Sequence, residues 1–212
     1  MKNIDKTKAL RLLLGLFLCA LSNSFELHCG LGLSSWGVFH QGLSRLLHIS
    51  FGQASIVCSL IILLFPGANG LRIGLGTVLN MLLIGWMVDL FDVFCLVPDA
   101  AALPQSMMML WLSMLFNAFG SCLYIGCALG CGPRDGLMSV LTGKTGKPVG
   151  FVRTVIEVSV LLVGILLGGH AGIGTVLIAL FIGTVVQFVY KVMDFDITSV
   201  QHQTIGRRTA KG

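Results

Sequence analysis

The sequence contains little charge. Only 11% of its 212 residues are Asp, Glu, Lys or Arg, while 55% are hydrophobic and the mean hydropathy is +0.91. Soluble domains usually contain about 25% charged residues. A chain with so few charges cannot cover a folded domain with a surface that water solvates, so most of its surface must face lipid. The composition therefore excludes a water-soluble globular protein.

The sequence also lacks the motifs of common catalytic and nucleotide-binding sites. It has no Walker-type phosphate loop, no H-E-x-x-H zinc motif and no Ser-His-Asp order. No stripe of basic residues alternates with aromatic ones, as it would in a nucleic-acid-binding surface. We therefore expect neither an enzyme nor a nucleic-acid partner.

Cysteine is present, but not in a metal-binding or redox pattern. The seven cysteines include no C-x-x-C pair with matching histidine spacing. Cys127 and Cys131 are four residues apart and would share one face of a helix, where we interpret them as small residues at a helix contact. We expect no metal and no cofactor. The five histidines are expected to be interfacial or solvated.

Long hydrophobic runs are the dominant feature of the chain. A helix needs ~20 apolar residues to cross ~30 Å of hydrocarbon. Six segments approach this length, at residues 9–28, 51–67, 73–95, 107–129, 151–168 and 173–192. The first follows a basic start and has the general shape of a signal peptide. We interpret it as a membrane helix, because a similar run occurs late in the chain. The sequence thus predicts an all-α membrane fold with six transmembrane helices.

One further segment, residues 36–48, is amphipathic. Trp36, Phe39 and Leu43 fall on one helical stripe, while His40 and Arg45 lie opposite. At thirteen residues it rises only ~20 Å as a helix. It is too short to span the membrane, so we expect it to be interfacial or re-entrant.

The positions of the basic residues predict the orientation. Cytoplasmic loops are enriched in Lys and Arg. With the N-terminus inside, all of the 14 basic residues except Arg45 fall on the cytoplasmic side, and the outer loop 96–106 has none. Both termini are therefore expected to be cytoplasmic.

The two halves of the chain are related by an ungapped shift of 98 residues. Residues 72–88 align with 170–186, and among the identical residues are Gly74, Gly76 and Thr77. The same shift pairs Leu31-Gly32 with Leu129-Gly130. We divide the chain into a first half (1–97), a second half (98–193) and a polar tail (194–212). Because each half has three spans, an odd number, the second must insert in the opposite orientation. Many secondary transporters and some channels are built from such inverted repeats.

The helical pattern is interrupted at equivalent places, residues 30–37 and 128–136, after the first span of each half. A half-helix that begins inside the membrane presents free N–H groups, which suit an anion. The alternative interpretation is a tight interfacial turn with nothing bound. Polar residues in these breaks and within the spans are the candidate substrate-binding residues: Ser34, Ser35, Trp36, Asn80, Asp89, Arg134, Asp135 and Glu157.

These residues also carry a family resemblance. The run G-L-G-L-S-S-W-G-V-F-H-Q-G-L, followed by R-I-G-L-G-T-V-L-N-M-L-L-I-G-W-M-V-D, resembles bacterial membrane proteins of the YczE/YyaS/YitT group, most closely the YczE-like branch. Ser35 replaces a proline of that family's pattern and Gly37 replaces an aspartate, although Asp135 is the counterpart of Gly37 in the second half. The resemblance covers nearly the whole chain. It implies a bacterial plasma-membrane location for a family of uncharacterised function.

Two functions fit these observations. The first is a small secondary transporter or channel-like protein for a small polar solute or anion. The second is an accessory membrane scaffold that modulates a partner, or forms a homo-oligomer, through glycine-rich helix faces such as Gly164 and Gly168. A polar cavity between the halves would favour transport, and a dry, glycine-packed core would favour the scaffold.

Overall fold

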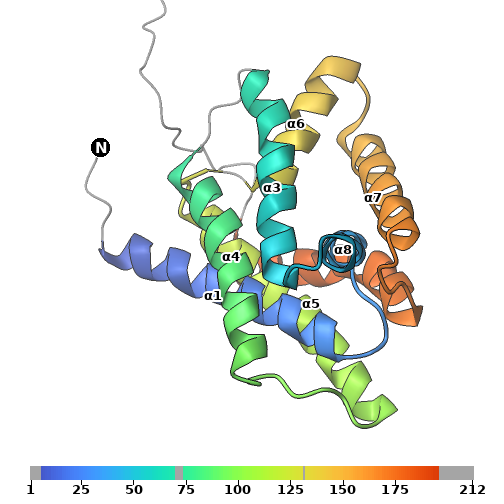
Figure 1. Cartoon of the computed structure of the whole chain (residues 1–212). Helices are drawn as coiled ribbons and strands as arrows, with labels where there is room; N and C mark the ends of the chain where they lie inside the picture. The colour runs from blue at the N-terminus through green and yellow to red at the C-terminus, as the bar shows by residue number, and fades with distance from the viewer. Residues whose placement is uncertain (1–5, 70–73, 131, 196–212) are drawn as a thin grey trace, which may run out of the picture.

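The computed structural model describes residues 6–69, 74–130 and 132–195, and this part of the chain is helical without strands. Its helices are α1 (Lys6–His28), α2 (Ser35–Leu47), α3 (Phe51–Ala68), α4 (Leu75–Val93), α5 (Leu103–Gly126), α6 (Pro133–Thr145), α7 (Val149–Leu166) and α8 (Ile173–Val192) (Figure 1). The predicted sites or topology markers Lys2, Arg72, Cys131 and the tail from residue 196 lie outside the described residues.

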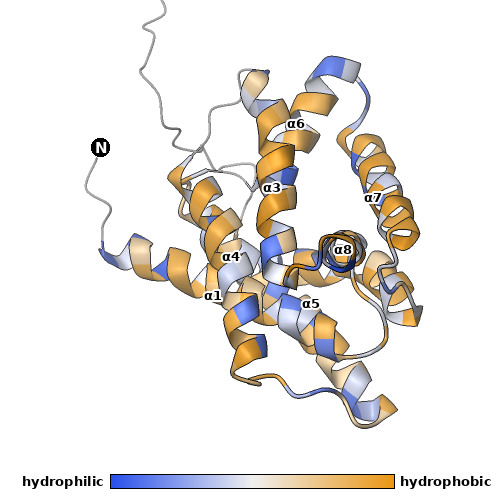
Figure 2. Cartoon of the chain, viewed as in Figure 1, coloured by the Kyte–Doolittle hydropathy of each residue, from blue (hydrophilic) through white to orange (hydrophobic). Residues whose placement is uncertain are grey.

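The six-span prediction is confirmed. Six of the described helices, α1, α3, α4, α5, α7 and α8, are long and apolar enough to cross a membrane. Their outer faces expose large apolar side chains, among them Ile61, Leu180 and Phe188 (Figure 2). A surface of this kind is stable only against lipid. The chain is therefore a multi-pass membrane protein.

The two remaining helices, α2 and α6, are short, with thirteen residues each, and α2 is amphipathic. α2 ends where His48 adopts a left-handed conformation, and α6 begins at Pro133 and ends at the left-handed Gly146. The expectation that all histidines are interfacial was wrong for His40. Its side chain is only 2% exposed, because α2 packs against both α3 and α7 and places His40 against the ring of Phe51.

The centre of the molecule is the crossing of α1 and α5, which pack against each other more extensively than any other pair (Figure 1). A Cβ atom added at Gly15 would lie 2.8 Å from the carbonyl oxygen of Gly120. A few turns away, the buried hydroxyl of Ser22 donates a hydrogen bond of 2.7 Å to the carbonyl oxygen of Ser113. Small residues thus let the two backbones touch, as in other membrane helix pairs.

The two halves also contact each other at their breaks, through two equivalent backbone hydrogen bonds. The amide of Gly76 donates to the carbonyl of Leu129 (2.8 Å), and the amide of Gly174 donates to the carbonyl of Leu31 (2.7 Å). Leu31 and Leu129 are 98 residues apart, as are Gly76 and Gly174. The helix pairs show the same equivalence, because the 98-residue shift relates α1 to α5, α2 to α6, α3 to α7 and α4 to α8. Accordingly, α1 packs on α4 as α5 packs on α8, and α2 packs on α7 as α6 packs on α3.

One pair of helices breaks this equivalence. In the first half, α3 packs closely on α4, and a Cβ at Gly85 would meet the carbonyl oxygen of Gly52 at 2.6 Å. In the second half, α7 and α8 make no comparable contact, and nothing lies within 4 Å of a Cβ added at Gly150 or Gly183, the counterparts of Gly52 and Gly85. The close contact between α3 and α4 in the first half therefore has no counterpart between α7 and α8 in the second half.

The α1–α5 crossing predicts a contrast between two glycines. We expect Gly15→Ala to destabilise the protein by about 1–3 kcal/mol, because the added methyl group overpacks a backbone contact. Gly183→Ala should be neutral or slightly stabilising, since the site is open and alanine favours a helix over glycine by up to ~1 kcal/mol. Thermal unfolding of the purified variants in detergent measures both. Equal melting temperatures would contradict the proposed close crossing.

Candidate functional site

A cavity of about 440 Å³ lies between the two halves, and all eight described helices contribute to its wall. Much of the wall is polar, from amides, hydroxyls, an indole and ionisable groups. These are Asn23, Trp36, Ser55, Ser59, Asn80, Asn117, Ser121, Tyr124, Arg134, Asp135, Arg153, Glu157 and Tyr190. Polar groups of this kind are costly within a membrane protein unless they pair or meet water. The concentration of them around one cavity marks it as the candidate site.

The wall is built largely from equivalent positions of the two halves. The guanidinium carbon of Arg134 lies 4.7 Å from the ring centre of Trp36, and these residues are 98 positions apart. Ser59 and Glu157 form a second pair with this spacing. The cavity therefore lies where equivalent parts of the two halves meet, with the Arg134–Trp36 stack as their direct contact.

The carboxylates of the cavity are held by aromatic donors. The indole N–H of Trp36 donates to Glu157 Oε1 at 3.1 Å, and the hydroxyl of Tyr124 donates to Asp135 Oδ2 at 3.4 Å. Asp135 lies in α6, outside the six spans. Burial raises the pKa of its carboxyl, while the Arg134 and Arg153 cations act in the opposite direction.

The N-terminus of α2 is already occupied by an anion from the chain itself. The backbone amide of Ser34 donates to Glu26 Oε2 at 3.0 Å, and Glu26 is only 5% exposed. A buried carboxylate is favourable here because the free N–H groups and the dipole of α2 attract negative charge. The hypothesis of a free anion site at this helix end is therefore wrong. The sequence did not reveal the role of Glu26, which lies near the end of its span and resembles an interfacial residue.

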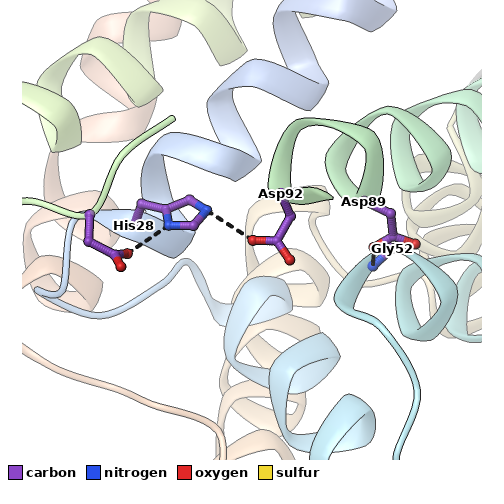
Figure 3. Close-up of polar contacts among 5 residues, drawn as sticks. His28, Gly52, Asp89 and Asp92 are labelled. Atoms are coloured by element: carbon purple, nitrogen blue, oxygen red, sulfur yellow. Dashed lines mark hydrogen bonds and ion pairs between the residues drawn. The ribbon is translucent and has the colours of Figure 1, made fainter. Parts of the chain in front are cut away.

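Of the eight candidate residues, five line the cavity: Trp36, Asn80, Arg134, Asp135 and Glu157. The other three do not. Ser34 precedes α2 and binds Glu26 through its amide, and Ser35 is the first residue of α2. Asp89 accepts a hydrogen bond from the Gly52 amide at 2.8 Å (Figure 3). It accepts a second from the Ser50 hydroxyl at 2.5 Å, and the two bonds fasten α3 to α4.

Sequence reasoning missed several polar residues of the wall, notably Asn23, Asn117, Tyr124 and Arg153. A usable signal existed for two of them. Asn23 and Asn117 are amides within membrane spans, and the 98-residue shift places each opposite another wall residue, Ser121 and Cys19. Tyr124 and Arg153 gave no such signal, because they lie near span ends.

A second polar cluster lies outside the cavity wall, at the end of α1. The ring of His28 binds Asp99 through Nδ1 at 2.7 Å and Asp92 through Nε2 at 3.4 Å (Figure 3). It joins the ends of α1 and α4 to the loop that leads into α5. We interpret this cluster as a structural fastening of that loop.

The fold and the cavity together define a multi-pass helical membrane protein with a polar interior chamber. The chain belongs to the family of unknown function DUF6198, which matches residues 6–191. It is 37% identical over 177 residues to an uncharacterized protein of Haemophilus influenzae, covering 84% of this chain and 80% of that protein. It is 33% identical over 159 residues to the uncharacterized membrane protein YczE of Bacillus subtilis, covering 74% and 73%. No solved structure matches. The predicted membership of the YczE-like family is confirmed.

The polar wall predicts that the cavity contains water. In a variant whose native cysteines are replaced, we expect Ser59→Cys to react with a small, charged methanethiosulfonate reagent, because Ser59 lines the cavity. Ser22→Cys, at a fully buried position between α1 and α5, should not react. Mass spectrometry of the labelled proteins in detergent measures the difference. Equal protection of both cysteines would indicate a dry interior.

Proposed function

We propose that the protein is a small secondary transporter or channel-like protein that moves a small polar solute or anion through this cavity, and that it is not an enzyme. The observation that carries the proposal is the cavity itself. It is lined by many polar groups, is large enough for a small ligand, and lies among helices whose outer faces are apolar. A polar chamber within a lipid-facing helical protein is the arrangement that transport requires.

The proposal includes an inverted arrangement of two three-span halves, 1–97 and 98–193, with both termini in the cytoplasm. The odd number of spans in each half requires the inversion. The reciprocal contacts Gly76–Leu129 and Gly174–Leu31 support it, because each half places its break on the third span of the other. The distribution of basic residues supports the orientation.

The difference between the α3–α4 and α7–α8 pairs suggests how access to the cavity alternates between the two sides of the membrane. α3 is fastened to α4 at Gly52, Gly85 and Asp89, whereas the counterparts of these residues, Gly150, Gly183 and Gln187, belong to helices that stand apart. If the halves exchange these two conformations, α7 closes on α8 while α3 opens from α4. Because the halves are inverted, this exchange would expose the cavity to the opposite side of the membrane.

The scaffold hypothesis receives less support. It required glycine-rich helix faces that remain available to a partner. Gly164, however, is used within the chain, where an added Cβ would lie 2.6 Å from the backbone nitrogen of Phe39 in α2. The interior is also not packed by glycine throughout, because it contains a cavity lined by many polar groups.

Transport is tested with the full-length protein in proteoliposomes, with uptake measured across a panel of radiolabelled small solutes. We expect saturable flux of at least one polar or anionic solute. Arg134→Gln should abolish it, since Arg134 lies in the cavity wall in contact with Trp36.

The matched control is Arg45→Gln, since Arg45 is an arginine of α2 that lies outside the cavity wall. This variant should retain the flux. Absence of saturable flux for every solute, or equal flux in the wild type and Arg134→Gln, would refute the proposal.

Alternation is tested by a cross-link between α7 and α8. In a cysteine-replaced background, Pro148→Cys combined with Gln187→Cys should form a disulfide during turnover, because the side chains of the counterpart residues Ser50 and Asp89 are in direct contact. A disulfide needs Cα atoms within about 7 Å. We expect the oxidised double variant to lose flux and to regain it on reduction.

The control pair is Gly143→Cys with Gln187→Cys, which joins helices that the exchange does not bring together. It should form no cross-link. Failure of the Pro148–Gln187 pair to form a disulfide, or full flux in its oxidised form, would contradict alternation by exchange.

A further inference from the structure

The cavity has an imbalance between hydrogen-bond donors and acceptors. Its two carboxylates, Asp135 and Glu157, each accept a hydrogen bond from an aromatic residue of the chain. Its two guanidinium groups, Arg134 and Arg153, donate no hydrogen bond to any of the described residues. Within the described residues every ion pair closer than 4.0 Å involves His28. An arginine offers five N–H donors. Among the charged groups of the cavity, those without a hydrogen-bond partner in the described residues are therefore the two cations.

The geometry of Arg134 is suited to a planar or tetrahedral oxyanion. The Trp36 ring lies against the guanidinium at 4.7 Å. The N–H groups of a guanidinium point outward in its own plane, so stacking on a ring leaves them free to bind oxygen atoms in pairs. The Trp36 ring is itself fixed by its bond to Glu157. The chain thus holds the cation in place while its N–H groups donate no hydrogen bond among the described residues.

A cation would fit this cavity less well. To bind Glu157 or Asp135 it would have to compete with the hydrogen bonds from Trp36 or Tyr124. It would also approach Arg134 and Arg153, and like charges at close range repel. An oxyanion instead supplies acceptors for the N–H groups of Arg134 and Arg153, which donate no hydrogen bond among the described residues. The cavity volume of about 440 Å³ limits the solute to a small one.

We propose that this cavity binds a small oxyanion, a carboxylate or an inorganic phosphate or sulfate, between Arg134 and Arg153. The inference rests on the proposed function for the role of the cavity, but it names the substrate class and adds Arg153 as a binding residue. Asp135 and Glu157 act as positioning groups that hold Tyr124 and Trp36 in the wall.

Binding is measured on the full-length protein in detergent by isothermal titration and thermal shift. The probes are the sodium salts of acetate, benzoate, phosphate and sulfate, with choline chloride as the cation and sorbitol as the neutral solute, at matched ionic strength. We expect saturable binding of at least one oxyanion and none of choline or sorbitol. Comparison of the carboxylates with phosphate and sulfate identifies the source of the oxyanion. Saturation separates specific binding from the general stabilisation that sulfate and phosphate give proteins.

The variants Arg134→Gln and Arg153→Gln should each weaken this binding by about ten- to a hundredfold, as expected when a hydrogen bond to a charged group is lost. Arg134→Lys should retain part of it, because the charge remains. Arg45→Gln, outside the cavity wall, should bind as the wild type does. Size-exclusion profiles establish that each variant is folded, and if Arg134→Gln aggregates, Arg134→Lys and Arg153→Gln carry the test.

The inference is overturned if no oxyanion binds saturably, if both folded arginine variants bind as tightly as the wild type, or if choline binds instead. These outcomes are separable from failure of the transport proposal. Oxyanion binding without flux in proteoliposomes would refute transport and leave the site intact. Flux of a cation or neutral solute without oxyanion binding would refute the oxyanion site and leave transport intact.

Discussion

The structure depends on one constraint, the close crossing of α1 and α5. At Gly15 and Gly120 the two backbones are too near to admit a methyl group, and at Ser22 and Ser113 a buried hydroxyl binds a carbonyl directly. Helices in lipid gain little from the hydrophobic effect when they associate, so close van der Waals contact and hydrogen bonds must hold them together. The crossing joins the first span of each half. It fixes the axis around which the other helices are arranged.

With the two first spans fixed together, the breaks that follow them can dock only on the opposite half. Leu31 and Leu129 each offer a carbonyl to a glycine amide at the start of a span in the other half. These contacts satisfy backbone groups that an interrupted helix would otherwise leave unpaired in lipid, where each costs several kcal/mol. They also direct the starts of α2 and α6 inward, which brings Trp36 against Arg134. The cavity is thus a consequence of how the breaks are satisfied.

The sequence predicted the helices well because span length and hydropathy are local properties. The six spans and the short α2 helix were all visible in it. The site was predicted in part. Five of the candidate residues line the cavity: Trp36, Asn80, Arg134, Asp135 and Glu157. A polar residue in a break or span is costly in contact with lipid, so it is usually placed in the interior. Asp89 shows the limit of this rule, since it lies in a span yet caps a neighbouring helix. Tyr124 and Arg153 show the converse, since only the tertiary fold turns these span-end residues inward.

The most informative departure from symmetry is the contrast between Asp89 and Gln187. Both follow the same span motif, but Asp89 accepts from the Gly52 amide and the Ser50 hydroxyl, whereas the counterpart of Ser50 is Pro148. A proline has no N–H and no hydroxyl, so the second half cannot form the same charged fastening. A closed α7–α8 pair would therefore be held more weakly than the closed α3–α4 pair. Under the proposed exchange, the structure with α3 on α4 would then be the state of lower free energy, and a bound solute would have to supply the difference.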